Sequence, residues 1–238
     1  MTAYNYSGFS ADEYNLNSFH GPIAGDKAPD FDVIDAQNEP RRILEFSGPF
    51  LVLELGSITC PLFQSRRNGM AALKTEFPDC AHAVLYVREA HPGQSIPAHG
   101  AMSDKIKSAC TLRDADKEPR DILIDDLKGT AHAAYGGYPN AVFIINRSGW
   151  VVYWSDWNNV AATRRALKRA LAGKSIRSEG LFFPAKPPVA LHTLRQAGPG
   201  AGMDFLKSLP TLVWKNLIRR NIMILIGRQG AIKPDTGC

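Results

Sequence analysis

The stretch from Phe50 to Phe63, FLVLELGSITCPLF, decides the fold of this 238-residue chain. It opens with an apolar run of strand length that ends at Gly56, and a short polar turn follows. Cys60 and Pro61 then begin a segment of helical character. Because free backbone N–H groups and the helix dipole favour thiolate over thiol, we expect Cys60 to be reactive, with a lowered pKa. The alternative is a buried cysteine that acts only as a small hydrophobic residue.

Strands and helices alternate along the rest of the domain. The expected strands are 31–33, 43–44, 50–55, 83–87, 120–125, 141–146 and 150–154, and the expected helices are 61–77, 103–112, 129–135 and 159–172. This order implies a mixed sheet that is covered on both faces, and the closing hairpin and last helix are what a thioredoxin-like domain requires. The expected fold class is α/β: a thioredoxin-like mixed sheet flanked by helices, with an N-terminal arm and hairpin and a C-terminal amphipathic helical extension.

Composition divides the chain into four segments. These are an N-terminal arm at 1–24, disordered or lying on the domain, a thioredoxin-like domain at 25–173, a Pro- and Gly-rich linker at 174–199, and a basic amphipathic extension at 200–238. Pro210 should kink or restart the extension helix. That helix is expected to pack on its own domain or in a homodimer, or to lie on an anionic membrane surface.

The net charge of +5 is unevenly distributed. From Lys174 onward there are ten Lys or Arg and three Asp or Glu, so the first 173 residues carry about −2. The body therefore offers no electrostatic case for nucleic-acid binding. No signal peptide is recognisable, no apolar stretch approaches the ~20 residues of a membrane span, and the four separated cysteines show neither disulfide-framework nor zinc spacing. We expect a cytoplasmic protein without a metal site, with peripheral membrane contact as the alternative.

Cys60, Glu89 and His91 all follow the carboxyl ends of predicted strands. In open α/β sheets, chemistry gathers outside these strand ends. Ser57 and Thr59 can donate hydrogen bonds to the sulfur or to a substrate, His91 can exchange a proton near neutral pH, and Glu89 can hold the His91 tautomer. Taken singly, the hydroxyls could equally close the turn, and the histidine could be a solvated loop residue.

Four short segments carry a resemblance to a known family. GSITCPLF at 56–63 is similar to the active-site signature of the iodothyronine deiodinases, with cysteine where that family has selenocysteine. YVREAHP at 86–92 resembles their YIEEAHP motif, while PAH at 97–99 and AYGGY at 134–138 resemble their Gln-His and AYGAY segments. The likeness covers roughly residues 45–172.

The resemblance implies a thiol-dependent oxidoreductase that removes iodine from an aromatic ring, with the Cys60 sulfur attacking iodine. The expected partners are a small iodinated phenol and a thiol reductant; no metal or organic cofactor is expected. A second thiol or the reductant would regenerate Cys60. The candidate residues are Cys60, His91, Glu89, Ser57 and Thr59 for catalysis, and Tyr86, His99 and Pro139 for substrate binding.

Two other functions stay open. APDF at 28–31 resembles the entry to peroxiredoxins, which suggests a thiol peroxidase, although Leu53 and Ser57 stand where the peroxiredoxin pattern has Pro and Thr. The other is a non-catalytic redox-fold scaffold that docks on a membrane through 200–238. Pro139, before a strand, could be the cis-proline of thioredoxin-like folds or an ordinary trans proline.

Overall fold

The computed structural model describes residues 4–178, 180–227 and 232–237. Its strands are β1 Asp32–Asp35, β2 Pro40–Arg42, β3 Phe50–Gly56, β4 Ala81–Tyr86, β5 Asp121–Ile124, β6 Val142–Asn146 and β7 Val151–Ser155. They form one sheet in the order β2-β1-β5-β4-β3-β6-β7. β3, β4 and β5 run parallel, while β6, β7 and β1 pair antiparallel to their neighbours. The predicted mixed sheet is confirmed.

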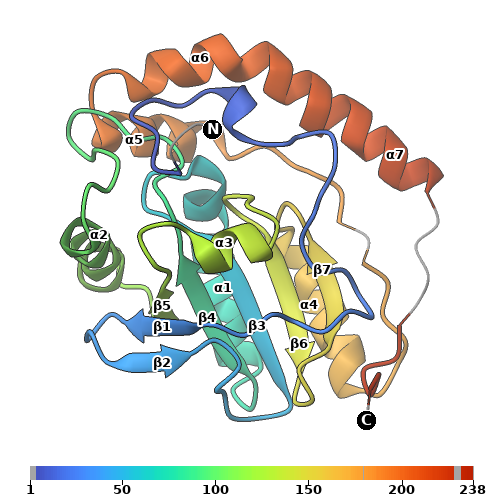
Figure 1. Cartoon of the computed structure of the whole chain (residues 1–238). Helices are drawn as coiled ribbons and strands as arrows, with labels where there is room; N and C mark the ends of the chain where they lie inside the picture. Colours follow the sequence, from blue (N-terminus) through green and yellow to red (C-terminus); the bar gives the residue numbers. More distant parts are fainter. Residues whose placement is uncertain (1–3, 179, 228–231, 238) are drawn as a thin grey trace.

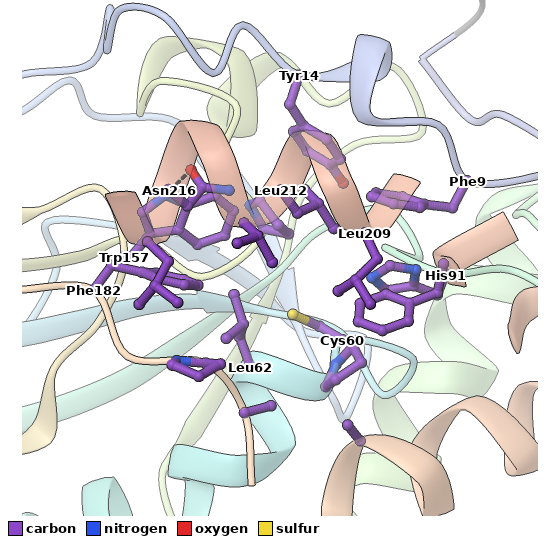
Figure 2. Close-up of a pocket in the computed structure, with 18 of the residues that line it drawn as sticks. Phe9, Tyr14, Cys60, Leu62, His91, Trp157, Phe182, Leu209, Leu212 and Asn216 are labelled. Atoms are coloured by element: carbon purple, nitrogen blue, oxygen red, sulfur yellow. Dashed lines mark hydrogen bonds between the residues drawn. The ribbon is translucent and has the colours of Figure 1, made fainter. Parts of the chain in front are cut away.

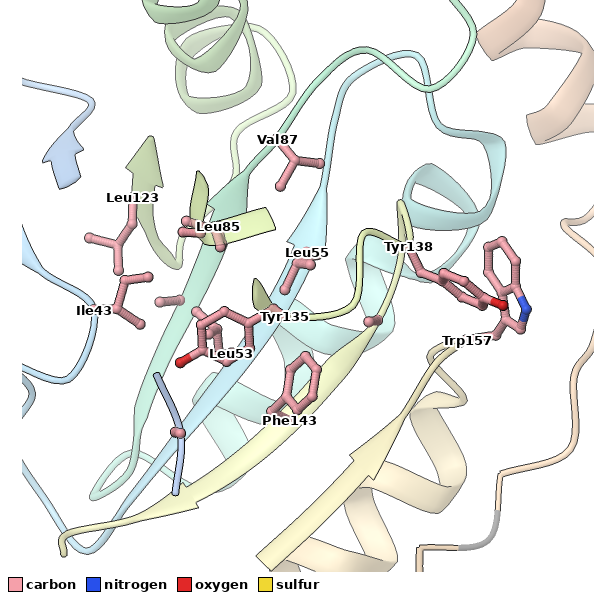
Figure 3. Packing of buried hydrophobic residues seen from close by; sticks show 14 of the residues in the cluster. Ile43, Leu53, Leu55, Leu85, Val87, Leu123, Tyr135, Tyr138, Phe143 and Trp157 are labelled. Atoms are coloured by element: carbon pink, nitrogen blue, oxygen red, sulfur yellow. The ribbon is translucent and has the colours of Figure 1, made fainter. Parts of the chain in front are cut away.

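Helices cover both faces of this sheet (Figure 1). They are η1 Ala11–Glu13, α1 Pro61–Glu76, α2 Met102–Asp114, α3 Thr130–Ala134, α4 Val160–Leu171, α5 Pro187–Ala197, α6 Ala201–Leu212, η2 Val213–Arg220 and α7 Asn221–Ile226. α1 and α4 lie on one face, and α3 and the N-terminal arm cross the other. The core on the second face centres on Leu53, Leu85 and Phe143 (Figure 3).

The turn after β3 leads directly into α1, which packs back on one face of the sheet. At Gly56 an added Cβ would lie 2.3 Å from the Phe63 ring, so only glycine permits this close approach. Cys60 is the N-cap of α1, and Pro61 opens the first turn, where a missing N–H costs nothing. The predicted strand–turn–Cys–Pro–helix arrangement is confirmed.

A buried carboxylate lies beneath this turn. Glu54, on β3, is fully buried and accepts hydrogen bonds from Arg120 at 2.5 Å, Asn140 at 2.8 Å and Asn158 at 2.6 Å. A buried charge needs such partners, because an unpaired one is costly to desolvate. The two asparagines follow directly after Pro139 and Trp157, so the network fixes the backbone beside both residues.

The N-terminal arm lies on the domain and is anchored by aromatic side chains. The Arg88 guanidinium lies 4.5–5.1 Å from the ring centroids of Tyr4, Tyr6 and Tyr14. The Tyr6 hydroxyl also donates to the Ala90 carbonyl at 2.8 Å. The arm therefore packs against the segment that follows β4.

The C-terminal segments pack back onto the domain. The predicted linker at 174–199 contains helix α5, which packs on α1, so this segment is more than a connection. The predicted extension helix is present as α6, η2 and α7, a nearly continuous run across the carboxyl end of the sheet (Figure 1). It passes through Pro210 without a break and widens into a π-helix over η2. Within the described ranges, no helix is both long enough and apolar enough to cross a bilayer.

Candidate functional site

A cavity of about 140 Å³ lies over Cys60, at the carboxyl end of the sheet (Figure 2). Three parts of the chain line it. The arm supplies Phe9, Tyr14 and Leu16; the domain supplies Cys60, Pro61, Leu62, His91, Pro139 and Trp157; and the C-terminal part supplies Phe182, Pro184, Ala185, Ala190, Phe205, Leu209, Leu212, Val213, Asn216 and Leu217. The wall is thus almost entirely apolar.

The Cys60 thiol is buried, with 2% of the residue exposed. Its Sγ accepts a hydrogen bond from the Phe63 N–H at 3.5 Å, as expected at a helix N-terminus. Burial nevertheless raises the pKa of Cys60 to about 11, against the lowering effects of the Phe63 and Leu62 N–H groups and of Arg66. The expected lowered pKa is therefore wrong for this buried thiol, because the loss of hydration outweighs the effect of the helix terminus.

His91 lies in the same cavity wall between two aromatic rings. Its ring centroid is 4.0 Å from that of Phe9 and 5.6 Å from that of Phe205. The Nδ1 atom is buried without a hydrogen-bond partner. Burial lowers the pKa of His91 to about 3, so the imidazole is neutral at physiological pH. Cys60 and His91 thus line the same largely apolar cavity as two neutral groups.

Glu89 does not orient His91, contrary to the sequence-based expectation. Its carboxylate accepts hydrogen bonds from Thr59, Tyr86 and His99. Although burial raises the pKa of Glu89, these partners together lower it below its usual value. Tyr86 and His99 are absent from the cavity lining, so the structure gives them a place behind the wall instead of direct substrate contact.

The two hydroxyls join the two motif loops and do not contact the sulfur. Ser57 Oγ accepts from the Ala90 N–H at 3.2 Å, and Thr59 Oγ1 accepts from the His91 N–H at 3.2 Å. The expected hydrogen bonds to Cys60 Sγ are not made. Their effect is indirect, because they fix the backbone that carries the thiol relative to the backbone that carries the imidazole.

The expected residue Pro139 lies in the cavity wall, whereas most of the wall, Trp157 and Asn216 included, was not predicted from the sequence. Pro139 lines the cavity and is trans, since the described residues contain no cis peptide bond. Trp157 donates from Nε1 to Oδ1 of Asn216 at 3.1 Å, and no hydrogen bond is described for Nδ2 of that asparagine. A signal was available, because Asn216 is an amide at helical spacing from the apolar residues Leu209 and Leu212.

The other described cysteines lie away from the cavity. Cys80 and Cys110 are free thiols, and neither lines it. In the described ranges, no group of three or more His, Cys, Asp or Glu side chains is arranged to hold a metal ion.

The sheet order and the cysteine that caps the helix after the central strand define a thioredoxin-like domain. Within that class, residues 4–164 match the iodothyronine deiodinase family model, and the chain belongs to that family. The predicted resemblance is confirmed.

Curated relatives give the same assignment. The chain is 31% identical over 143 residues to thyroxine 5-deiodinase of Gallus gallus, covering 55% of each protein. It is 28% identical over 171 residues to thyroxine 5-deiodinase of Bos taurus, covering 65% of this chain and 56% of that protein. The chain thus spans about half the length of the curated relatives it matches.

Among solved structures, a hypothetical protein from Sinorhizobium meliloti aligns with a TM-score of 0.53 and 19% identity, over 66% of this chain and 88% of that one. This likeness concerns the fold alone. The match to the family model ends at residue 164, so the C-terminal residues that complete the cavity lie outside the family match.

Proposed function

We propose that this protein is a thiol-dependent reductive dehalogenase that removes iodine from an aromatic ring held in the cavity over Cys60. One observation carries the proposal: a single thiol and an imidazole whose Nδ1 has no hydrogen-bond partner share a cavity with an almost entirely apolar wall. An aromatic halide is apolar enough to enter such a space, and the thiol and the imidazole are the groups that the reaction needs.

The size of the cavity favours a single-ring substrate. At about 140 Å³ it is close to the ~150 Å³ apolar cavity known to bind benzene. A monocyclic iodophenol would fill this volume, while the second ring of a two-ring substrate would extend beyond it. Asn216 Nδ2 would donate a hydrogen bond to the phenolic oxygen.

The proposed step balances without any external proton. The Cys60 sulfur forms a bond to iodine as the carbon–iodine bond breaks, and the bonding pair stays on carbon. The thiol proton passes to that carbon through His91. The products are the deiodinated arene, reduced by two electrons, and an oxidised Cys60 sulfenyl iodide. Since thiol and imidazole start neutral, no isolated charge has to be held in the apolar cavity beforehand.

An external thiol then regenerates Cys60. The first reductant molecule attacks the Cys60 sulfur, releases iodide and a proton, and leaves a mixed disulfide. A second molecule attacks that disulfide, frees the Cys60 thiol and leaves as oxidised reductant. Cys80 and Cys110 lie away from the cavity, which supports a reductant from solution; the proposal includes no other cofactor.

The test is a panel assay on the purified protein with dithiothreitol. Iodide release is measured from ortho-iodophenol, para-iodophenol and thyroxine, alongside reduction of hydrogen peroxide and of a protein disulfide. Cys60→Ser should abolish iodide release, because a hydroxyl oxygen cannot replace the sulfur as the nucleophile that bonds to iodine. His91→Ala should slow it on the order of 10²- to 10⁴-fold and leave Cys60 alkylation largely intact. Cys80→Ser, a buried cysteine outside the cavity, is the matched control.

Two outcomes would contradict the proposal. Iodide release that survives in Cys60→Ser would remove the nucleophile from the mechanism. Turnover of peroxide or disulfide by wild-type protein with no iodide release would instead assign a generic thiol chemistry to the cavity.

A further inference from the structure

The helical run α6–η2–α7 leaves a long apolar face uncovered. Its inner side closes the cavity, while large hydrophobic side chains on its outer side are 49–74% exposed. These residues are Met203, Leu206, Trp214, Ile222, Met223 and Leu225. Scattered exposed hydrophobic residues are normal in proteins, but a contiguous row along one helix marks an interaction surface.

The helical run, together with the α5 segment before it, holds the net charge of the protein, and four of the basic residues lie on the run itself. Residues 186–227 contain six Lys or Arg and a single acid, Asp204. The other 22 basic and 22 acidic residues of the chain cancel, so the whole net charge of +5 resides here. Lys207 and Arg219 are exposed beside the apolar row.

Polar contacts fix which side of the run faces outward. Arg220 forms an ion pair with Asp156, and Asn221 exchanges two hydrogen bonds with the Phe182 backbone, at 2.7 and 3.0 Å. Ser208 accepts from the Ala11 N–H at 3.2 Å. The apolar row is therefore presented to the surroundings by a helix that is held to the domain along its length.

We propose that the outer face of α6–η2–α7 docks on an anionic lipid bilayer, with the helix lying in the plane of the interface. An apolar face with tryptophan, bordered by lysine and arginine, is the composition of interfacial helices. A second copy of the chain fits less well, because a two-fold contact through this face would bring the basic residues Lys207, Lys215 and Arg219 of both copies into one interface.

Vesicle flotation tests the proposal on the full chain. Wild-type protein should float with vesicles of phosphatidylcholine and phosphatidylserine and stay behind with phosphatidylcholine alone, and added salt should weaken the binding. The double variant Leu206→Glu/Trp214→Glu should lose at least about tenfold in vesicle affinity, because two charges would enter the interface. Ile23→Glu, which changes an exposed hydrophobic residue on the arm, is the matched control and should float like wild type.

Circular dichroism and Cys60 alkylation establish that each variant is folded. Failure of the wild type to float, or equal flotation with neutral vesicles, would overturn the proposal. A dimer in size-exclusion light scattering that the double variant alone dissociates would also overturn it, because a second copy would then cover this face. None of these readouts depends on iodide release.

Discussion

Cys60 is subject to two opposing electrostatic influences. Its position at the N-terminus of α1 favours the thiolate, and Arg66 on the next turn adds to this effect. Burial under the C-terminal helix acts in the other direction and is the larger influence, because desolvation shifts of 3–5 pKa units are known for fully buried groups. The thiol is therefore protonated while the cavity is closed.

We expect Cys60 alkylation to increase with pH toward about pH 11, without a plateau near neutrality. Phe205→Ala should lower this midpoint and accelerate labelling, because removal of that ring admits water to the sulfur. The measurement is a short iodoacetamide pulse at several pH values, with mass spectrometry of the labelled peptides.

Cys110, which is partly exposed on α2, provides the internal control for this experiment. A Cys60 labelling rate that levels off below about pH 8 would contradict the protonated resting state. An unchanged midpoint in Phe205→Ala would contradict the assignment of the high pKa to the covering helix.

At the scale of the element, η2 is the part of the C-terminal helical run that places a polar side chain at the cavity. π-Helical turns are rare and occur frequently at functional sites. Here the wide turn carries Asn216, whose Oδ1 accepts from Trp157 while its Nδ2 has no described partner. An otherwise apolar lid thus brings one amide to the cavity wall.

Asn216→Ala should raise KM for iodophenol about threefold to tenfold, because the hydrogen bond from Nδ2 to the phenolic oxygen is lost. The value of kcat should change little. The KM for iodobenzene, which has no hydroxyl, should barely move. Steady-state iodide release with both substrates measures the difference. Asn221→Ala is the matched control, since it removes a helix anchor that does not line the cavity.

Equal KM changes for the two substrates would show that Asn216 acts only by holding the helix in place. A KM change as large in Asn221→Ala as in Asn216→Ala would have the same meaning.

At the scale of the whole molecule, three buried neutral histidines link folding to pH. Burial lowers the pKa of His91 and His132 to about 3 and that of His82 to about 4. In the unfolded chain a histidine titrates near 6.5. Between these values the unfolded state binds more protons than the folded state, so acid favours unfolding.

The free energy of unfolding should therefore fall as pH drops from about 6.5 toward about 4, by up to about 1.4 kcal/mol per pH unit for each histidine. Urea unfolding at several pH values measures it. His132→Gln should make the free energy of unfolding fall less steeply with decreasing pH, because one fewer proton is bound on unfolding. The substitution His192→Gln, at an exposed position, should leave this slope unchanged. A flat profile between about pH 6.5 and 4 would contradict neutral buried imidazoles.

The sequence was sufficient to predict the positions of site residues that depend on local structure or on where a strand ends. Cys60 at the helix start and His91 after the next strand follow from periodicity and parallel pairing, so their convergence was predictable. The histidine partner of Glu89 could not be predicted, because His91 and His99 are both near Glu89 in the sequence. Only the fold of the loop determines which of them bonds to the carboxylate. Pro187 illustrates a misread signal: proline content suggested a linker, but proline also opens helices.

For a different reason, the sequence could not predict that the C-terminal extension lines the cavity. Asn216 and Phe205 lie more than a hundred residues from Cys60, and apolar helix periodicity does not say what the helix covers. The alternatives of a domain, a second copy and a membrane therefore stayed open. The structure shows that the inner face of the helix packs on its own domain.

The cover over Cys60 also bears on the chemical lifetime of the protein in air. Progressive oxidation of a cysteine to sulfenic and then sulfinic acid follows thiolate character and exposure. A protonated sulfur with 2% of its residue exposed offers neither. The burial of the sulfur in this cavity should therefore protect the thiol from irreversible oxidation.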